Sequence, residues 1–349
     1  MAYTTIDDPS AYFQTAIWSG TGSALSVTFD GNSDMQPDMV WVKNRTTSSD
    51  HRLSDSVRGT SSHLVPNDAA AIDTSSTALT AFNSDGFSVG TEQSYSQSGK
   101  NHVGWAWKAG TSFTNDASGT GIGTIDSAGS VSTDAGFSIT KFTADGNNLT
   151  AAHGLGVAPT MIITKNLSIS KQWSVYHSSL GAGKAIFLNV TDVADTDNTY
   201  WNNTAPTSTT LSYGTWSGNN NGNEIIAYCF AEKKGYSKFG SYTGNGNADG
   251  TFVYTGQKSA FIMIKASSRA GTWNMYDVKR STFNNVDDFI TANTPDAETT
   301  GNTYQNIDIL SNGFKCRGTG TGTNESGSTY IYMAFAENPF VTSTGVPAT

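Results

Sequence analysis

The hydrophobic positions of this 349-residue chain fall in short runs. Clusters of Gly, Asn, Asp and Ser separate these runs roughly every 8–12 residues, as expected for strands joined by tight turns. The runs are rich in Val, Ile, Phe, Tyr, Trp and Thr, which are typical of strands. No segment carries a sustained 3.6-residue apolar period with helix caps, so helices should be few and short. The pattern predicts an all-β protein of antiparallel sandwich or jelly-roll type.

Two sets of segments repeat three times along the chain. The first set is PDMVWVK at 37–43, PTMIITK at 159–165 and SAFIMIK at 259–265. The second set is HRLSD at 51–55, WSVYH at 173–177 and WNMYD at 273–277. In both sets the last residues of successive copies are 122 and 100 residues apart. A shared register of this kind indicates three copies of one structural unit.

We therefore expect three tandem antiparallel β-sandwich domains. They comprise residues 1–110, residues 136–234 and residues 235–349, the last with a short C-terminal tail. Residues 111–135 are rich in Gly, Ser, Thr and Ala and are predicted to form a flexible linker. Almost nothing separates the second unit from the third, so these two should pack closely while the first is positioned more independently. The continuously apolar strands at 161–163 and 261–264 should be central strands, buried on both faces.

Repeated aromatic residues are the candidate binding residues. Trp173 and Trp273 occupy matching positions, and Tyr176 and Tyr276 follow them at matching spacing. Sugars bind to aromatic faces, so these four residues are candidate contacts for a glycan or a partner protein. The alternative is that strand alternation turns both tryptophans into the core, and we favour this interpretation.

The recurring lysines at the strand ends also have two interpretations. Lys43, Lys165 and Lys265 either extend their amines from the strand ends to solvent or form salt bridges with acidic loop residues. Their presence in all three copies favours a structural role.

Charge and cysteine content exclude several classes of protein. The chain has 20 basic and 29 acidic residues, a net charge of -9, and no basic runs, so nucleic-acid binding is not expected. Cys229 and Cys316 are too few for a disulfide framework and are predicted to be buried free thiols. The N-terminus lacks the basic and apolar regions of a signal peptide. No apolar run approaches the ~20 residues of a membrane span.

No motif for catalysis, a cofactor or a metal stands out. The five histidines form no H-x-x-x-H pattern, and the glycine-rich stretches lack the lysine of a phosphate-binding loop. Asp192, Asp195 and Asp197 are a weak candidate for Ca²⁺, because the glycine and terminal Glu of an EF-hand are missing. Asp55 and Asp277 occupy matching positions, but His177 stands there in the second unit. The sequence therefore predicts a non-enzymatic protein without a cofactor or a metal.

Several longer segments resemble a family of repeat-containing virion structural proteins of marine tailed bacteriophages. These segments are GYSKFGSYTGNGNADGTFVYTG at 235–256, HGLGVAP at 153–159, YCFAE at 228–232, LSNGF at 310–314 and YIYMAFAE at 330–337. The resemblance covers the chain from Tyr12 to Pro347. Members of this family have been called tail-fibre, capsid-associated or lectin-like proteins.

The resemblance implies a structural role on the virion surface, after assembly in the host cytoplasm. We expect a compact capsid decoration protein or a tail-appendage knob, with major capsid or tail proteins as partners. One alternative is a receptor-binding tail fibre that recognises host surface glycans. A second alternative, from another class, is a glycan depolymerase. The resemblance carries no catalytic residues to this chain.

Overall fold

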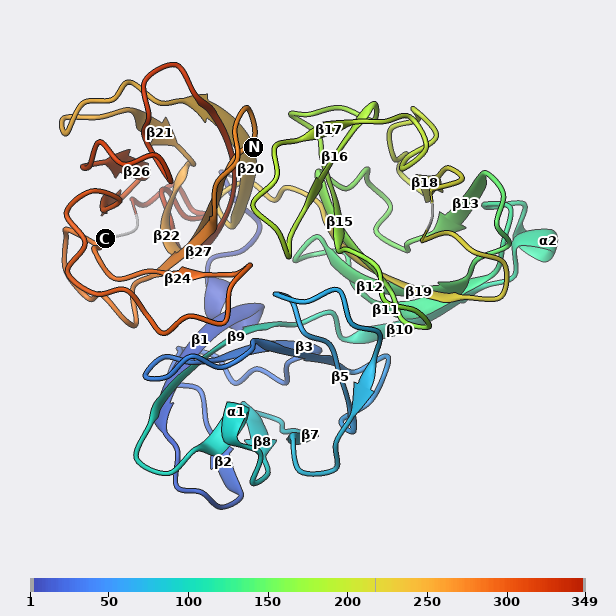
Figure 1. Cartoon of the computed structure of the whole chain (residues 1–349), viewed down its shortest axis with the longest axis horizontal. Helices are drawn as coiled ribbons and strands as arrows, with labels where there is room; N and C mark the ends of the chain where they lie inside the picture. Colours follow the sequence, from blue (N-terminus) through green and yellow to red (C-terminus); the bar gives the residue numbers. More distant parts are fainter. Residues whose placement is uncertain (1–2, 217, 348–349) are drawn as a thin grey trace.

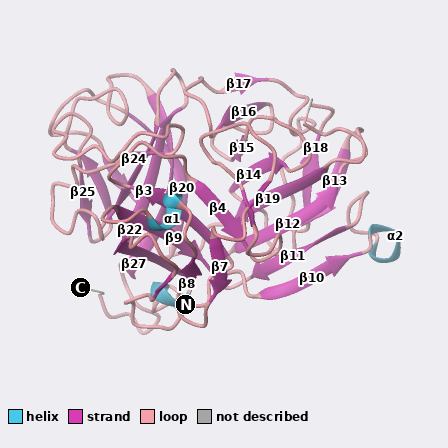
Figure 2. Ribbon diagram, turned by 60° about the horizontal axis from the view of Figure 1, so that its bottom comes forward, coloured by secondary structure: helices cyan, strands magenta, loops and turns pink. Residues whose placement is uncertain are grey.

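Three lobes of similar topology surround a common centre in the computed structural model of the chain (Figure 1). The structure describes residues 3–216 and 218–347. All paired strands run antiparallel, and the helices are single short turns, so the all-β prediction is confirmed. Figure 2 shows how strands and loops make up nearly all of the molecule. No helix among the described residues is long and apolar enough to cross a membrane.

The first lobe comprises the chain up to Ala109. Its elements are η1 (Pro9–Ala11), β1 (Phe13–Ser19), β2 (Leu25–Val27), β3 (Met39–Asn44), β4 (Arg52–Asp55), β5 (Ser62–His63), β6 (Asp73–Thr74), β7 (Leu79–Phe82), β8 (Phe87–Val89), α1 (Gln93–Ser96) and β9 (Asn101–Trp107). Its large sheet has the order β1-β9-β3-β4, and its small sheet has the order β2-β8-β7. Strands β5 and β6 form a separate pair.

The second lobe extends from Gly110 to Lys234. Its elements are β10 (Thr111–Asn115), α2 (Ala117–Thr120), β11 (Ser127–Ser132), β12 (Phe137–Thr143), β13 (Leu149–Ala152), β14 (Met161–Asn166), β15 (Ser174–His177), β16 (Lys184–Phe187), β17 (Asp195–Thr196), β18 (Thr210–Tyr213) and β19 (Glu224–Phe230). Its large sheet has the order β10-β11-β12-β19-β14-β15-β16-β17, and β13 pairs with β18.

The third lobe begins at Gly235. Its elements are β20 (Ser237–Thr243), β21 (Phe252–Tyr254), β22 (Gln257–Ala266), β23 (Trp273–Asp277), β24 (Ile290–Thr291), β25 (Ile307–Leu310), β26 (Gly313–Cys316) and β27 (Thr329–Pro339). The sheet orders are β20-β27-β22-β23-β24 and β21-β26-β25. The orders β1-β9-β3-β4, β12-β19-β14-β15 and β20-β27-β22-β23 are therefore equivalent, and they follow the three sequence repeats.

The segment predicted to be a linker is part of the second lobe, so this prediction is wrong. Residues 111–115 and 127–132 form β10 and β11, and β11 pairs with β12 along its whole length. Gly129 explains why a glycine-rich segment joins a sheet here. A Cβ atom at this position would lie 1.9 Å from the carbonyl oxygen of Ile139 and 2.9 Å from the Phe113 ring. Low side-chain bulk permits a close strand approach, and composition alone cannot distinguish this case from flexibility.

Glycine turns recur at equivalent positions in the first and third lobes. Gly86 precedes β8, and a Cβ atom there would lie 2.0 Å from the carbonyl oxygen of Val27. Gly313 begins β26, and its Cβ atom would lie 2.1 Å from the carbonyl oxygen of Val253. Both positions require a residue without a side chain because the neighbouring strand passes so close.

The central strands of each large sheet are buried on both faces. In the first lobe Val40 and Val42 pack with the small sheet, whereas Met39 and Trp41 on the opposite face belong to the central core. The strands at 161–163 and 261–264 are likewise buried on both faces, as predicted. The second and third lobes have their own inner clusters and share the same central core. The first lobe is therefore not positioned independently of the others.

Candidate functional site

An aromatic ring from each lobe meets at the centre of the molecule. Trp107 on β9, Phe230 on β19 and Phe335 on β27 occupy equivalent positions, because they pair with Met39, Met161 and Phe261 respectively. The ring centroids are 6.4 Å apart for Trp107 and Phe230, 5.6 Å for Trp107 and Phe335, and 5.9 Å for Phe230 and Phe335. We call these three rings the aromatic triad. It marks an approximate three-fold axis.

The centre is closely packed. A space of only about 10 Å³ remains beside the triad, and its lining is composed of apolar and aromatic side chains such as Trp41, Ile163 and Met263. A cavity of this size and character stays dry. The arrangement is therefore a hydrophobic core and offers no room for a ligand.

Polar contacts between the lobes follow the same three-fold pattern. The Tyr228 hydroxyl of the second lobe donates a 2.6 Å hydrogen bond to the Asp55 carboxylate of the first. The Trp105 indole of the first lobe donates a 2.9 Å hydrogen bond to the Asp277 carboxylate of the third. His177 of the second lobe lies 3.3 Å from the carbonyl oxygen of Tyr332 in the third, measured from Nε2. The contacts therefore close a ring of three lobes.

The two buried carboxylates each have an arginine three residues later. Arg58 Nε donates to Asp55 at 2.6 Å, and Arg280 Nε donates to Asp277 at 2.5 Å. All four side chains are almost completely inaccessible. Burial alone would lower the pKa of each guanidinium, but the adjacent carboxylate raises that pKa above its ordinary value. Each guanidinium therefore stays charged in the interior, where the carboxylate and further hydrogen bonds compensate for the loss of water.

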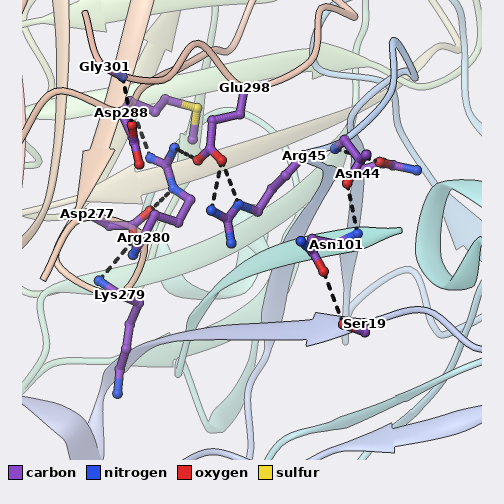
Figure 3. Close-up of polar contacts among 12 residues, drawn as sticks. Ser19, Asn44, Arg45, Asn101, Asp277, Lys279, Arg280, Asp288, Glu298 and Gly301 are labelled. Atoms are coloured by element: carbon purple, nitrogen blue, oxygen red, sulfur yellow. Dashed lines mark hydrogen bonds and ion pairs between the residues drawn. The ribbon is translucent and has the colours of Figure 1, made fainter. Parts of the chain in front are cut away.

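The arginine in the third lobe extends its charge network to the first lobe (Figure 3). Arg280 Nη1 donates to Glu298 at 2.7 Å, and Arg45 of the first lobe donates to the same carboxylate at 2.8 Å. Glu298 also donates its backbone N–H to the Arg45 carbonyl oxygen. The sequence analysis did not identify Arg45, Arg280 or Glu298. Arg280 does recur as Arg58, three residues after the matching acid, and this repeat is the signal that could have found it.

His177 replaces the acid–arginine pair in the second lobe. The Ser179 backbone N–H donates to Nδ1 at 3.2 Å, so Nε2 carries the proton and donates to Tyr332. Burial lowers the pKa of His177 to about 4, which keeps the ring neutral at neutral pH. Leu180 stands three residues later, where the other lobes have arginine. A neutral donor needs no counter-charge, so the absence of an arginine leaves no buried charge unpaired.

The candidate aromatic residues lie inside the molecule. Trp173 and Trp273 belong to the central core, whereas Tyr176 and Tyr276 belong to the inner clusters of their own lobes. All four are at most 4% exposed, so the suggested surface contact with a glycan or partner is wrong. Alternating side chains of a strand point to opposite faces, and here both faces are covered, so the tryptophans lie in the core as the favoured interpretation predicted.

The two tryptophans also connect neighbouring lobes. Trp173 Nε1 donates to the carbonyl oxygens of Val65 and Asp68 in the first lobe, both at 3.0 Å. Trp273 Nε1 donates to Phe187 in the second lobe at 2.9 Å. His51 stands at the matching position of the first lobe, and its Nε2 lies 3.1 Å from the Thr291 carbonyl oxygen of the third.

The repeated lysines are completely buried. Lys165 Nζ donates to Ala69 of the first lobe at 2.9 Å, and Lys265 Nζ donates to Asp192 of the second at 3.0 Å, both through carbonyl oxygens. Lys43 Nζ donates to the carbonyl oxygens of Asn44 and Thr47 in its own lobe. Burial lowers the pKa of each lysine to about 8. The lysines are structural, as predicted, but they do not extend to solvent, and none of them forms a salt bridge with another residue that the structure describes.

The other candidates for chemistry are also accounted for. Cys229 and Cys316 are free and buried, as predicted, and burial raises the pKa of both thiols to about 12. Among residues 3–216 and 218–347, no three His, Cys, Asp or Glu side chains are grouped as a metal site would require. Asp55 and Asp277 face arginines in the interior, so they are not an accessible pair of acids for glycoside hydrolysis.

The fold and the contacts between lobes define an all-β protein whose three sandwich-like lobes are joined by one central core. The family described as "Domain of unknown function (DUF7483)" matches residues 8–339, and the chain belongs to this family. Neither a curated protein nor a solved structure matches the chain.

Proposed function

We propose that this protein is a non-enzymatic structural component of a bacteriophage particle, displayed on the virion surface after assembly in the host cytoplasm. The observation that carries the proposal is the approximate three-fold arrangement of a single chain around the aromatic triad. Three similar faces on one chain match the symmetry of a three-fold or quasi-three-fold position on a capsid. The resemblance of the repeats to virion proteins of marine tailed phages supports the same setting.

Both ends of the described chain fold back onto the third lobe, which favours a compact decoration or knob. The Tyr3 hydroxyl donates to the Gly256 carbonyl oxygen at 2.9 Å. The Ser343 backbone N–H donates to Asp7 at 2.6 Å. These contacts hold the two ends beside each other, so residues 3–11 and 338–347 do not extend away as arms. Attachment to major capsid or tail proteins would then use the surface of the folded body.

The copy number per particle tests the proposal. Purified virions are separated by gel electrophoresis, and the band of this protein is compared with that of the major capsid protein. Hundreds of copies are expected for a capsid decoration protein, and about a dozen for a tail appendage. Absence of the protein from gradient-purified particles, while it is abundant in the lysate, would overturn the proposal.

Imaging of the intact virion would show where on the particle this protein lies. We expect a density of three lobes, one copy over each occupied three-fold or quasi-three-fold position, or a knob at the tail. Particles that lack the gene product serve as the control. The density assigned to this protein must be absent from the same place on these particles.

A further inference from the structure

One edge of the large sheet in the first lobe is open, whereas the second lobe covers the equivalent edge. Strand β1 lies at the end of its sheet and, among the residues that the structure describes, pairs with β9 alone. Its counterpart in the second lobe is β12, because Phe13 and Phe137 pair with the equivalent residues Trp107 and Phe230. Strand β11 covers the edge of β12, and β10 in turn covers β11.

The open edge of β1 presents unpaired backbone groups. Neighbouring residues of an antiparallel strand direct their N–H and C=O groups to opposite sides. The Gly20 N–H donates to the Lys100 carbonyl oxygen in continuation of the β1–β9 register, so the even-numbered residues bond to β9. Thr15, Ile17 and Ser19 therefore direct their backbone groups to the open edge.

This edge can be reached from outside. Ile17 is 47% exposed, and Ser19 is also exposed. Thr15 is mostly buried, but it lines a groove of about 230 Å³ between the first and third lobes. Strand β1 contains neither a proline nor a charged residue, and proteins commonly use these residues to keep an edge strand from pairing. The edge is therefore free to accept a further strand.

The groove lies where β11 runs in the second lobe. Ser130 on β11 lies beside Asp38 of the first lobe, with its Oγ 3.4 Å from the carboxylate. Asp38 corresponds to Ala260 of the third lobe, because each accepts a backbone hydrogen bond from the residue that follows the repeated segment 51–55 or 273–277. Ala260 lines the groove together with Thr15. In Figure 1, β11 lies at the junction of the second and first lobes, and β1 lies at the junction of the first and third.

The third lobe does not offer an equivalent edge. Its edge strand is β20, and the Ser237 N–H at one end donates to the Lys233 carbonyl oxygen. At the other end the Thr243 carbonyl oxygen accepts a 2.9 Å hydrogen bond from the Thr251 hydroxyl. The chain itself thus uses both ends of this edge, whereas the outward backbone groups of β1 have no partner among the described residues.

We infer that an extended segment of another protein pairs with the open edge of β1, as β11 pairs with β12. In this mode of binding, backbone hydrogen bonds supply the affinity and the space beside the edge selects the side chains. Strand β11 has the sequence SAGSVS, so the corresponding place between two lobes admits small side chains. Gly129 within it has no room for a Cβ atom, which would lie 1.9 Å from the Ile139 carbonyl oxygen. We expect a segment of Gly, Ala and Ser residues at β1 as well.

The charge of the groove indicates which residue follows this segment. The lining includes the carboxylates of Asp8, Asp30 and Glu337, and Lys279 is the one basic residue of the lining that the structure describes. Strand β11 runs antiparallel to β12, so its C-terminal end lies at the start of β12. A segment bound to β1 in the same way has its C-terminal end at the start of β1, beside these acids. A lysine or arginine at that end would complement the groove.

Amide NMR on the full chain tests the pairing. The probe is the synthetic peptide SAGSVSK with both ends blocked, and we expect it to bind with a Kd on the order of millimolar. The amide signals of Thr15, Ile17 and Ser19 should shift on binding. The peptide SAGSVSE should bind about twofold to fivefold more weakly, because its carboxylate meets the acids of the groove.

Two N-methylated peptides are the matched controls. In the alignment of β11, the second and fourth residues direct their N–H groups to the neighbouring edge, and the third and fifth direct theirs away. Methylation of the second and fourth nitrogens should abolish binding, whereas methylation of the third and fifth should preserve it. Both peptides are compared on the unchanged protein, so this test does not depend on the folding of a variant.

Ile17→Pro tests the edge from the side of the protein. It removes an N–H group that faces the open edge and none that bonds to β9, and it should weaken binding about tenfold. Ser241→Pro is the matched control, because Ser241 occupies the equivalent position on β20 and should not affect the affinity. The inference is overturned if SAGSVSK does not bind, if methylation of the second and fourth nitrogens has no effect, or if Ile17→Pro binds as tightly as the unchanged protein.

The source of the segment rests on the proposed function, and we assign it to an extended arm of a major capsid or tail protein. A photoreactive benzoylphenylalanine in place of Ile17 should cross-link to such a protein in purified virions, whereas the same group in place of the exposed Ser26 on β2 should not. Cross-linking to a second copy of this chain, or to nothing, would overturn the assigned source. The peptide experiment needs no virion, so its failure and the failure of the proposed function are distinguishable.

Discussion

The Tyr228 hydroxyl lies 2.6 Å from the Asp55 carboxylate, although the two residues come from different lobes and are separated by 173 positions in the sequence. Both side chains are buried, and Arg58 supplies the positive charge that the carboxylate needs. The equivalent place in the third lobe holds Asp277, Arg280 and the Trp105 indole. A buried ion pair that accepts a hydrogen bond from another lobe therefore helps to fix the contact between the two lobes. Substitutions that remove this hydrogen bond or the ion pair should change the free energy of unfolding.

Tyr228→Phe should destabilise the protein by about 1–2 kcal/mol, because it removes one hydrogen bond to a charged group but preserves the ring. Asp55→Ala should cost more, about 3–5 kcal/mol, because it leaves the Arg58 guanidinium buried without its partner. Urea unfolding of both variants measures these free energies. Equal losses in the two variants would contradict the role assigned to the ion pair.

Transplanting the acid of the other lobes into the second lobe should fail without its arginine. His177→Asp would bury a carboxylate that faces the Tyr332 carbonyl oxygen, and we expect a loss of about 3 kcal/mol or more. Adding Leu180→Arg supplies the missing guanidinium at the repeat position. The double variant should recover part of the lost stability, as measured by urea unfolding. Leu180→Arg alone is the control and should not stabilise the protein.

Acid should weaken the contact between the second and third lobes. The pKa of His177 is about 4 in the folded protein, against the ordinary value of 6.5. The unfolded chain therefore binds more protons between these pH values, and the stability contribution is complete above pH 6.5 and is lost as the pH falls toward 4. This difference in pKa corresponds to a loss of about 3 kcal/mol in the free energy of unfolding once His177 is fully protonated.

His177→Gln removes this titration and is the test. Its free energy of unfolding should fall less steeply between pH 6.5 and 4.5, by up to about 1.4 kcal/mol per pH unit. Burial also lowers the pKa of His51, to about 3, so part of the acid sensitivity should remain. An identical pH slope in the variant would show that His177 is not the group responsible.

Loss of one ring of the aromatic triad should affect all three lobes. Trp107→Ala creates a cavity beside Phe230 and Phe335 and should cost about 3–5 kcal/mol. Because the three lobes share this core, the unchanged protein should unfold in a single calorimetric transition, and amide exchange in the variant should increase in every lobe. Faster exchange confined to the first lobe would mean that the lobes unfold separately. Phe252→Ala on the exposed face of β21 is a control that should change neither measurement.

The strand composition was sufficient to predict the all-β class, and the repeat register was sufficient to predict the equivalent strands. The Val, Ile and aromatic runs gave all-β architecture because such residues fit a half-buried pleated surface. Matching spacing located the equivalent strands, including those that carry Met39, Met161 and Phe261 in the same register. The alternation around Trp173 also indicated its core position, since residues two apart share a face.

The structure of residues 111–135 and the contacts between lobes could not be predicted from local patterns. Residues 111–135 have a composition that suits a flexible segment, and only the pairing of β11 with β12 shows that small residues there allow close strand contact. Arg45 and Glu298 are 253 positions apart in the sequence, yet they form an ion pair between the first and third lobes. Their meeting is a result of long-range packing, which no local pattern records.

The sequence by itself determined that the chain contains three β units, that a lysine recurs in all three, and that a tryptophan and an acid each recur in two of them. Only the tertiary structure decided what those residues contact. Each large sheet leaves an apolar face that its own small sheet does not cover, and burying three such faces against one another removes them from water together. Residues such as Asp55 and Trp173 then find their partners in the next lobe, because the centre brings the edges of the sheets into contact.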